Sequence, residues 1–222
     1  NAGQDGAWWM AVNHVILKEY HHEKRVPYFL DYQKRFTDSP FLVELSGEDG
    51  AYECGQLLRA NRLDKYSTVE NGDWKFLFWD ETTGAPKMPM GSVGDRWGKE
   101  KGKWNLLLKD GLDGTPIDPM LSFLDGNDGV VQVRLDDFGE GRSIHRGVPV
   151  KHLKTTDGKT VVVATVYDLL MAQFGVDRGL GGDYPAGYDD ENAPYTPAWS
   201  EKYTGMDRQT LLKFAREWAS TA

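Results

Sequence analysis

Cysteine is the scarcest residue of this sequence, since Cys54 is the single one among 222 residues. One thiol forms no disulfide within the chain, and it supplies neither a cysteine-rich zinc site nor an iron–sulfur cluster. Nothing basic adjoins Cys54 to favour its thiolate form, so we expect a buried, inert thiol within a strand. The low cysteine count also favours a reducing compartment.

Long apolar runs and an excess of basic charge are missing as well. No run approaches the roughly 20 apolar residues that cross a bilayer. The formal net charge of −8 argues against a nucleic-acid partner. The glycine-rich segment 91–98 has neither the Walker lysine pattern nor a dinucleotide fingerprint after a strand, so a tight structural loop is favoured there over a phosphate-binding one.

Helical patterns occupy both ends of the chain. Apolar residues on nearly every side predict a buried helix over about Gly6–Tyr20, and a second helix is expected over Pro27–Phe36. Near the end, Val166–Phe174 has helical spacing, and Thr196 and Asp207 are expected to cap two further helices.

The middle of the chain has the pattern of short strands separated by turns. Alternating or β-branched runs bounded by Gly, Asp and Pro predict strands at 41–45, 51–60, 74–79, 130–135 and 160–166. No internal repeat is evident. We therefore expect an irregular, β-rich insertion between two helix-rich ends.

Isolated histidines and paired acids offer little chemistry by themselves. His14, His21 and His22 lack the converging ligands of a metal site, so a solvated helix face is expected for them. His145 and His152 have no evident partner. The pairs Asp136–Asp137 and Asp189–Asp190 are expected in solvated turns, because acid–base catalysis needs convergence that spacing alone does not reveal.

The turn Gly3-Gln4-Asp5 is the most informative short segment. It leads into the first helix, so backbone amides and a carboxylate meet at one place. Such a carboxylate accepts two hydrogen bonds from the ring N–H and amino group of guanine. From the residues alone, simple helix capping is the favoured interpretation of Asp5.

Several segments together resemble the molybdopterin oxidoreductase (DMSO reductase) superfamily, and within it the catalytic alpha subunit of respiratory, membrane-bound molybdenum nitrate reductases. Residues 3–19, which read GQDGAWWMAVNHVILKE, resemble the superfamily's Gly-Thr/Gln-Asp turn and apolar helix. Near the end of the chain, residues 195–199, 204–205 and 208–218 also resemble a segment of the superfamily. Residues 27–45 continue the superfamily resemblance of residues 3–19, and the narrower resemblance is carried by residues 91–94, 96–98, 101–106 and 165–169.

The resemblance implies that the chain is an internal fragment of that subunit and is inactive alone. The parent would reduce nitrate to nitrite at a Mo-bis(molybdopterin guanine dinucleotide) centre, with quinol-derived electrons arriving through [4Fe-4S] clusters. Gly3, Gln4 and Asp5 would contact a guanosine end of the cofactor, which reverses the interpretation of Asp5. No catalytic residue and no metal ligand is expected in this chain, because the family's cysteine cluster and molybdenum-ligating aspartate lie outside it.

The resemblance also implies an organisation and a set of partners. We expect an α/β chain that holds a partial Rossmann-like three-layer domain of the formate dehydrogenase/DMSO reductase type. Residues 1–2 are interpreted as a tag remnant, 3–46 and 160–222 as the cofactor-binding part, and 47–159 as the β-rich insertion. The expected partners are the rest of the alpha subunit, an iron–sulfur beta subunit and a membrane gamma subunit, on the cytoplasmic side of the cell membrane. The alternatives are a selenate, chlorate or formate enzyme, or a non-catalytic binding module.

Overall fold

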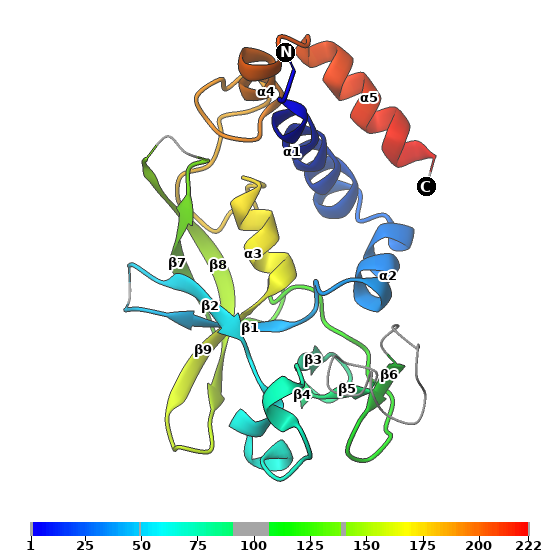
Figure 1. Ribbon diagram of the computed structural model, residues 1–222, viewed down its shortest axis with the longest axis vertical. Coiled ribbons are helices and arrows are strands. Elements are labelled where there is room, and N and C mark those ends of the chain that lie inside the picture. Colours follow the sequence, from blue (N-terminus) through cyan, green and yellow to red (C-terminus); the bar gives the residue numbers. More distant parts are fainter. Residues whose placement is uncertain (1, 49, 91–106, 139–140, 222) are drawn as a thin grey trace. The chain divides into compact units, whose positions relative to one another are not determined.

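The computed structural model describes residues 2–48, 50–90, 107–138 and 141–221, which form two compact units (Figure 1). Unit 1 comprises Asn1–Leu30, Gln132–Val148 and Leu170–Ala222, and unit 2 comprises Asp31–Val131 and Pro149–Leu169. The glycine-rich segment 91–98 and the neighbouring residues through 106, which carry part of the family resemblance, lie outside the described residues.

Helices make up most of unit 1. They are α1 (Asp5–Ile16), its π-helical continuation η1 (Leu17–Glu23), α4 (Pro197–Thr204) and α5 (Arg208–Ser220). Helix α1 packs against both α4 and α5. The buried apolar contacts between α1 and α5 come from two matched sets of residues, Ala11, Val12 and Val15 on α1 with Leu211, Leu212 and Ala215 on α5.

The expected caps of the two last helices are confirmed. The Thr196 hydroxyl accepts a hydrogen bond from the Trp199 amide at 3.1 Å, and the Asp207 carboxylate accepts one from the Thr210 amide at 2.9 Å. Each cap satisfies an amide that has no partner inside its own helix. Gly205 ends α4 in the left-handed conformation, at φ 72°.

Strands dominate unit 2. Strand β1 (Leu42–Ser46) lies between β2 (Glu53–Leu57) and β9 (Thr160–Thr165), and smaller ribbons are formed by β3 (Phe78–Asp80) with β4 (Ala85–Lys87) and by β5 (Pro89–Met90) with β6 (Leu107–Asp110). Short 3₁₀ turns η2 (Ala60–Arg62), η3 (Asp64–Tyr66) and η4 (Gly72–Trp74) connect them. The apolar core beneath includes Leu42, Leu58, Tyr66, Leu77, Met88, Phe123 and Val163.

Four elements carry the chain from one unit into the other. They are α2 (Pro27–Phe36), β7 (Gly129–Asp136), β8 (Ser143–Lys154) and α3 (Val166–Gln173). Strand β8 is the longest strand described, and no strand was expected there. Its Gly147 and Pro149 interrupt the alternating pattern by which a strand is recognised.

The chain is a mixed α/β protein, but its main sheet is not the expected Rossmann-like one. The five strands follow the order β2-β1-β9-β8-β7, and the pairings β1–β2, β1–β9 and β8–β9 are antiparallel. Strands β8 and β9 follow each other through a short turn, whereas a parallel pair needs a crossover of a dozen or more residues. The Rossmann-like architecture is therefore not confirmed by the described residues. The expected division at 47–159 stays a prediction.

None of the helices in the described ranges combines the length and the apolar character needed to cross a bilayer.

Candidate functional site

The turn at Gly3, Gln4 and Asp5 lies at the start of α1, in unit 1. Gly3 has φ 78°, a conformation that favours glycine, and a Cβ at this position would meet no atom within 4 Å. Gln4 is the N-cap residue, and its side chain makes no capping hydrogen bond. Asp5 is the first residue of the helix and is exposed. Exposed amides and a carboxylate therefore meet here, since the first turn of a helix leaves its N–H groups without partners inside the helix.

The helix behind this turn is held firmly. Ala7, only two residues beyond Asp5, is buried against Tyr195 and Trp199. The Trp8 amide donates to the Gln4 carbonyl at 3.3 Å, which begins the helical hydrogen bonding. A turn anchored in this way presents its polar groups in a fixed direction, as ligand recognition requires.

The helix is not buried on every side, contrary to expectation. Trp9 is 43% exposed and stacks edge-on with Trp218 of α5, which is 55% exposed, at 5.5 Å between ring centroids. Helices α4 and α5 cover only part of the apolar surface of α1, so the rings of Trp9 and Trp218 remain exposed at the surface of unit 1.

The histidines of this helix are more buried than expected. His14 and His21 are 2% and 4% exposed, so the prediction of a solvated face was wrong for both. The Nδ1 atom of His14 donates to the Phe174 carbonyl at 2.5 Å, and the ring of His21 packs against Phe29. Burial lowers the pKa of each to about 4, so both are neutral at pH 7. The partner of His14 lies 160 residues along the chain and that of His21 lies in the next helix, and helix geometry alone reveals neither.

Three further expectations need correction. Cys54 lies in a strand as expected, but it is exposed. His152 has an evident partner, because its backbone amide donates to Asp128 at 2.9 Å and its ring lies 3.8 Å from the same carboxylate. Asp137 is 3% exposed instead of solvated, and it forms an ion pair with Arg142. Asp189 is solvated as expected, with a side chain 85% exposed.

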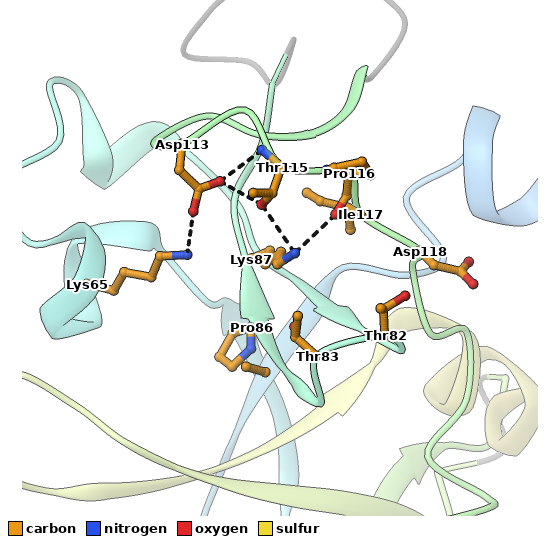
Figure 2. Close-up of a pocket in the computed structure, with 11 residues that line it drawn as sticks. Lys65, Thr82, Thr83, Pro86, Lys87, Asp113, Thr115, Pro116, Ile117 and Asp118 are labelled. Atoms are coloured by element: carbon orange, nitrogen blue, oxygen red, sulfur yellow. Dashed lines mark hydrogen bonds and ion pairs between the residues drawn. The ribbon is translucent and has the colours of Figure 1, made fainter.

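A second candidate is a hollow of about 600 Å³ in unit 2, between β4 and the segment that follows β6 (Figure 2). Figure 2 shows Lys65 directed at Asp113, and Lys87 directed at the Thr115 hydroxyl and the Pro116 carbonyl. Lys65 also lies 2.9 Å from Asp110, whose carboxylate accepts a hydrogen bond from the Tyr66 hydroxyl at 2.5 Å.

The charges around this hollow neutralise one another. Lys87 Nζ lies 3.0 Å from Asp80, and both side chains are buried. Burial would raise the pKa of Asp80, but hydrogen bonds from Thr83, the Asp118 amide and Lys87 lower it to about 2. A carboxylate held so firmly in its charged form serves poorly as a general acid or base near neutral pH. We therefore interpret this network as structural support for the loop after β6.

Sequence reasoning did not single out Glu19, Arg146 or the Asp80–Lys87 pair. Glu19 and Arg146 depend on contacts with distant segments, and Asp80 and Lys87 meet across the paired strands β3 and β4, so no local spacing marks any of them. The only local signal is a charged residue inside an otherwise apolar run, such as Asp80 after Phe78 and Trp79. No group of His, Cys, Asp and Glu that could hold a metal ion occurs within the described ranges.

Comparison with known proteins gives one consistent result. No family model matches the chain. It is 39% identical over 222 residues to the nitrate reductase alpha chain of Bacillus subtilis, and 41% identical over 234 residues to the respiratory nitrate reductase 1 alpha chain of Escherichia coli. It is 38% identical over 227 residues to the nitrate reductase alpha subunit of Mycobacterium tuberculosis.

The matches cover almost all of this chain and a small part of each relative. They include 99% of the chain in the first two comparisons and 100% in the third, but only 18% of each relative's length. Over essentially its whole length, this chain is homologous to one segment of the nitrate reductase alpha chains.

Proposed function

We propose that this chain forms part of the alpha subunit of a respiratory nitrate reductase and contributes one wall of its cofactor site. The parent reduces nitrate to nitrite at a Mo-bis(molybdopterin guanine dinucleotide) centre with electrons that come from quinol. The single observation that carries the proposal is the 38–41% identity to nitrate reductase alpha chains over 99–100% of this chain. The chain by itself is inactive in this proposal, because it matches less than a fifth of those relatives.

Gly3, Gln4 and Asp5 are the proposed contacts to a guanosine end of the cofactor. The chemistry of this turn fits such a group. Asp5 is an exposed carboxylate that accepts hydrogen bonds, as the N–H groups of guanine require, and the positive end of α1 favours a nearby phosphate. The buried contacts of Ala7 keep the turn in place.

The cofactor, when bound, supplies the oxygen-atom transfer chemistry at molybdenum. The part of this chain is to bind and orient the nucleotide tail. We assign no described residue to molybdenum or to an iron–sulfur cluster, since one cysteine cannot hold a cluster.

The remaining features of the proposal concern the parent. Its partners are an iron–sulfur beta subunit and a membrane gamma subunit, on the cytoplasmic side of the membrane. The Rossmann-like cofactor domain would be completed by strands from the rest of the alpha subunit, with the antiparallel sheet of this chain beside them. The relatives are named alpha chains, which supports the presence of further subunits, and their greater length supports further alpha-subunit residues around this chain.

Turnover by the parent polypeptide tests the proposal. The purified, cofactor-loaded protein is given a reduced viologen dye and nitrate, and nitrite is measured. We expect nitrite formation, with lower specificity constants for selenate and chlorate and no oxidation of formate. Preferential turnover of selenate, chlorate or formate would assign the chain to the alternative enzyme class. A gene that starts just before Gly3 and ends just after Ala222 would instead support a non-catalytic binding module.

A further inference from the structure

Helix α1 has more apolar surface than the described residues bury. Residues 7–12 read AWWMAV, and a helix that is apolar on nearly every side is normally enclosed by neighbours on every side. Ala7, Ala11 and Val12 are at most 4% exposed, whereas Trp9 is 43% exposed. One side of the helix is therefore open in this chain, although its sequence is that of an enclosed helix.

The open side continues from α1 onto α5. The ring centroid of Trp9 lies 5.5 Å from that of Trp218 and 5.8 Å from that of Phe214, and the rings of Phe214 and Trp218 lie 5.8 Å apart. Trp218 is 55% exposed. We call these three side chains the tryptophan face. Adjoining exposed aromatic rings mark interaction surfaces, and tryptophan is enriched among the residues that dominate binding energies.

The charges beside the tryptophan face are already neutralised. Each cation of α5 lies between 2.8 and 3.8 Å from a carboxylate, in the pairs Arg208 with Asp189, Lys213 with Glu217, and Arg216 with Glu19. An anionic membrane or a nucleic acid is attracted by clusters of cations that have no such partners. The tryptophan face therefore favours an uncharged, apolar protein surface as its partner.

The length of the relatives indicates where that surface comes from. This chain matches only 18% of the nitrate reductase alpha chains of Bacillus subtilis and Escherichia coli, so more than four fifths of each relative consists of other residues. Permanent contacts are more apolar than transient ones and resemble a domain core cut in half. Exposed tryptophans with neutralised surroundings fit a permanent contact.

We propose that the tryptophan face packs against an apolar segment of the parent alpha subunit that lies outside this chain. This inference rests on the proposed function, because the occupant belongs to that subunit. The segment supplies aliphatic or aromatic side chains that bury the rings, and oxygen atoms that accept hydrogen bonds from the indole N–H groups of Trp9 and Trp218. It thereby encloses α1, the helix that begins at the turn Gly3–Asp5.

Hydroxyl-radical footprinting of the purified parent holoenzyme tests whether the face is buried. Mass spectrometry gives the oxidation rates of Trp9 and Trp218 in the native protein and after unfolding in guanidinium chloride. Rings that are 43% and 55% exposed would be protected about twofold, whereas enclosed rings should be protected about tenfold or more. Protection below about tenfold at either ring overturns the proposal. The experiment uses the unaltered sequence, so it does not depend on the folding of a variant.

A photo-crosslinker identifies the occupant. Trp218→p-benzoylphenylalanine in the parent holoenzyme should give crosslinks to alpha-subunit peptides outside the stretch that corresponds to this chain. Crosslinks only to another subunit, to a second alpha subunit, to lipid or within this chain overturn the proposal. The matched control is Lys213→p-benzoylphenylalanine, at an exposed position about 140° around α5 from Trp218. The same crosslinked peptides from both positions also overturn it, because the contact would then not belong to the tryptophan face.

Nitrate turnover of the same preparation separates this inference from the proposed function. Reactive tryptophans in a holoenzyme that reduces nitrate overturn the buried face and leave the proposed function standing. Protected tryptophans with the expected crosslinks, in a protein that reduces no nitrate, support the buried face and contradict the proposed function.

Discussion

The guanidinium of Arg216 holds the carboxylate of Glu19 through three contacts of 2.8–3.2 Å, which join α5 to η1 within unit 1. Glu19 is only 8% exposed, and the Tyr188 hydroxyl donates to it as well, at 3.0 Å. Burial would raise the pKa of Glu19, but the hydrogen bonds from Arg216 and Tyr188 lower it below its usual value. The hydrogen-bonded ion pair of Glu19 and Arg216 therefore holds the helices of unit 1 together, in addition to the buried apolar contacts between α1 and α5.

Loss of the ion pair between Glu19 and Arg216 should destabilise the chain measurably. Glu19→Gln replaces a charged acceptor of Arg216 and Tyr188 by a neutral one, and we expect a loss of about 1–3 kcal/mol in the free energy of unfolding. The control is Glu217→Gln, which removes an exposed pair with Lys213 at 3.8 Å and should cost less than about 0.5 kcal/mol. Urea denaturation measures the free energy of unfolding of both variants. Equal losses would contradict a stabilising role of the Glu19–Arg216 ion pair.

The buried histidines should make the chain acid-sensitive. The pKa of His14 falls from 6.5 to about 4 on burial, so below pH 6.5 the unfolded chain takes up a proton that the folded chain does not. Stability is therefore present above pH 6.5 and is lost as the pH falls towards 4, with a slope of up to about 1.4 kcal/mol per pH unit. His14→Gln should flatten this slope between pH 6.5 and 4.5, because it removes a group that burial keeps neutral in the folded chain. An unchanged slope in folded His14→Gln would show that His14 is not the sensitive group.

Gly147 should tolerate no side chain. A Cβ at this position would overlap the carbonyl of Leu180, to whose neighbour Gly181 the Gly147 amide donates at 2.8 Å. Gly147→Ala should cost about 1–3 kcal/mol, because backbone atoms have to move. Gly129→Ala is the matched control, since a Cβ there meets no atom within 4 Å. Equal midpoints of thermal unfolding for the two variants would contradict the close approach of Gly147 to the Leu180 carbonyl.

The buried pair of Asp80 and Lys87 should be sensitive to the loss of one partner. Lys87→Met leaves the Asp80 carboxylate buried without its counter-ion, and we expect a loss of roughly 3–5 kcal/mol. Lys159→Met removes an exposed partner of Asp157 at 3.5 Å and should cost less than about 0.5 kcal/mol. Similar unfolding free energies for the two variants would show that the buried pair is not a significant support.

Local signals explain which parts of the fold were predictable. The caps at Thr196 and Asp207 act on amides three residues ahead, so sequence alone indicates where α4 and α5 begin. The pattern at 160–166 likewise matches β9. Strand β8 was missed because its stability comes from neighbouring strands and its sequence contains glycine and proline.

Distant contacts explain the rest. The burial of His14 involves Phe174, which lies 160 residues along the chain, so spacing does not reveal it. A partial Rossmann-like domain was expected from resemblance to a larger protein, whereas the pairings β1–β2, β1–β9 and β8–β9 are antiparallel. The turn at Gly3–Asp5 was found at the start of a well-anchored helix, and its role in binding stays a prediction.

The most direct measurement is the cofactor content of the parent protein with Asp5→Ala, beside Glu70→Ala as an exposed-acid control. Molybdenum and the guanine nucleotide released on denaturation are quantified after extensive dialysis. We expect Asp5→Ala to lose guanine nucleotide and molybdenum together, through cofactor binding weakened about 5- to 150-fold, a cost of about 1–3 kcal/mol. Glu70→Ala should retain both. Full and equal occupancy in both variants would contradict the assignment of this turn to the guanosine end of the cofactor.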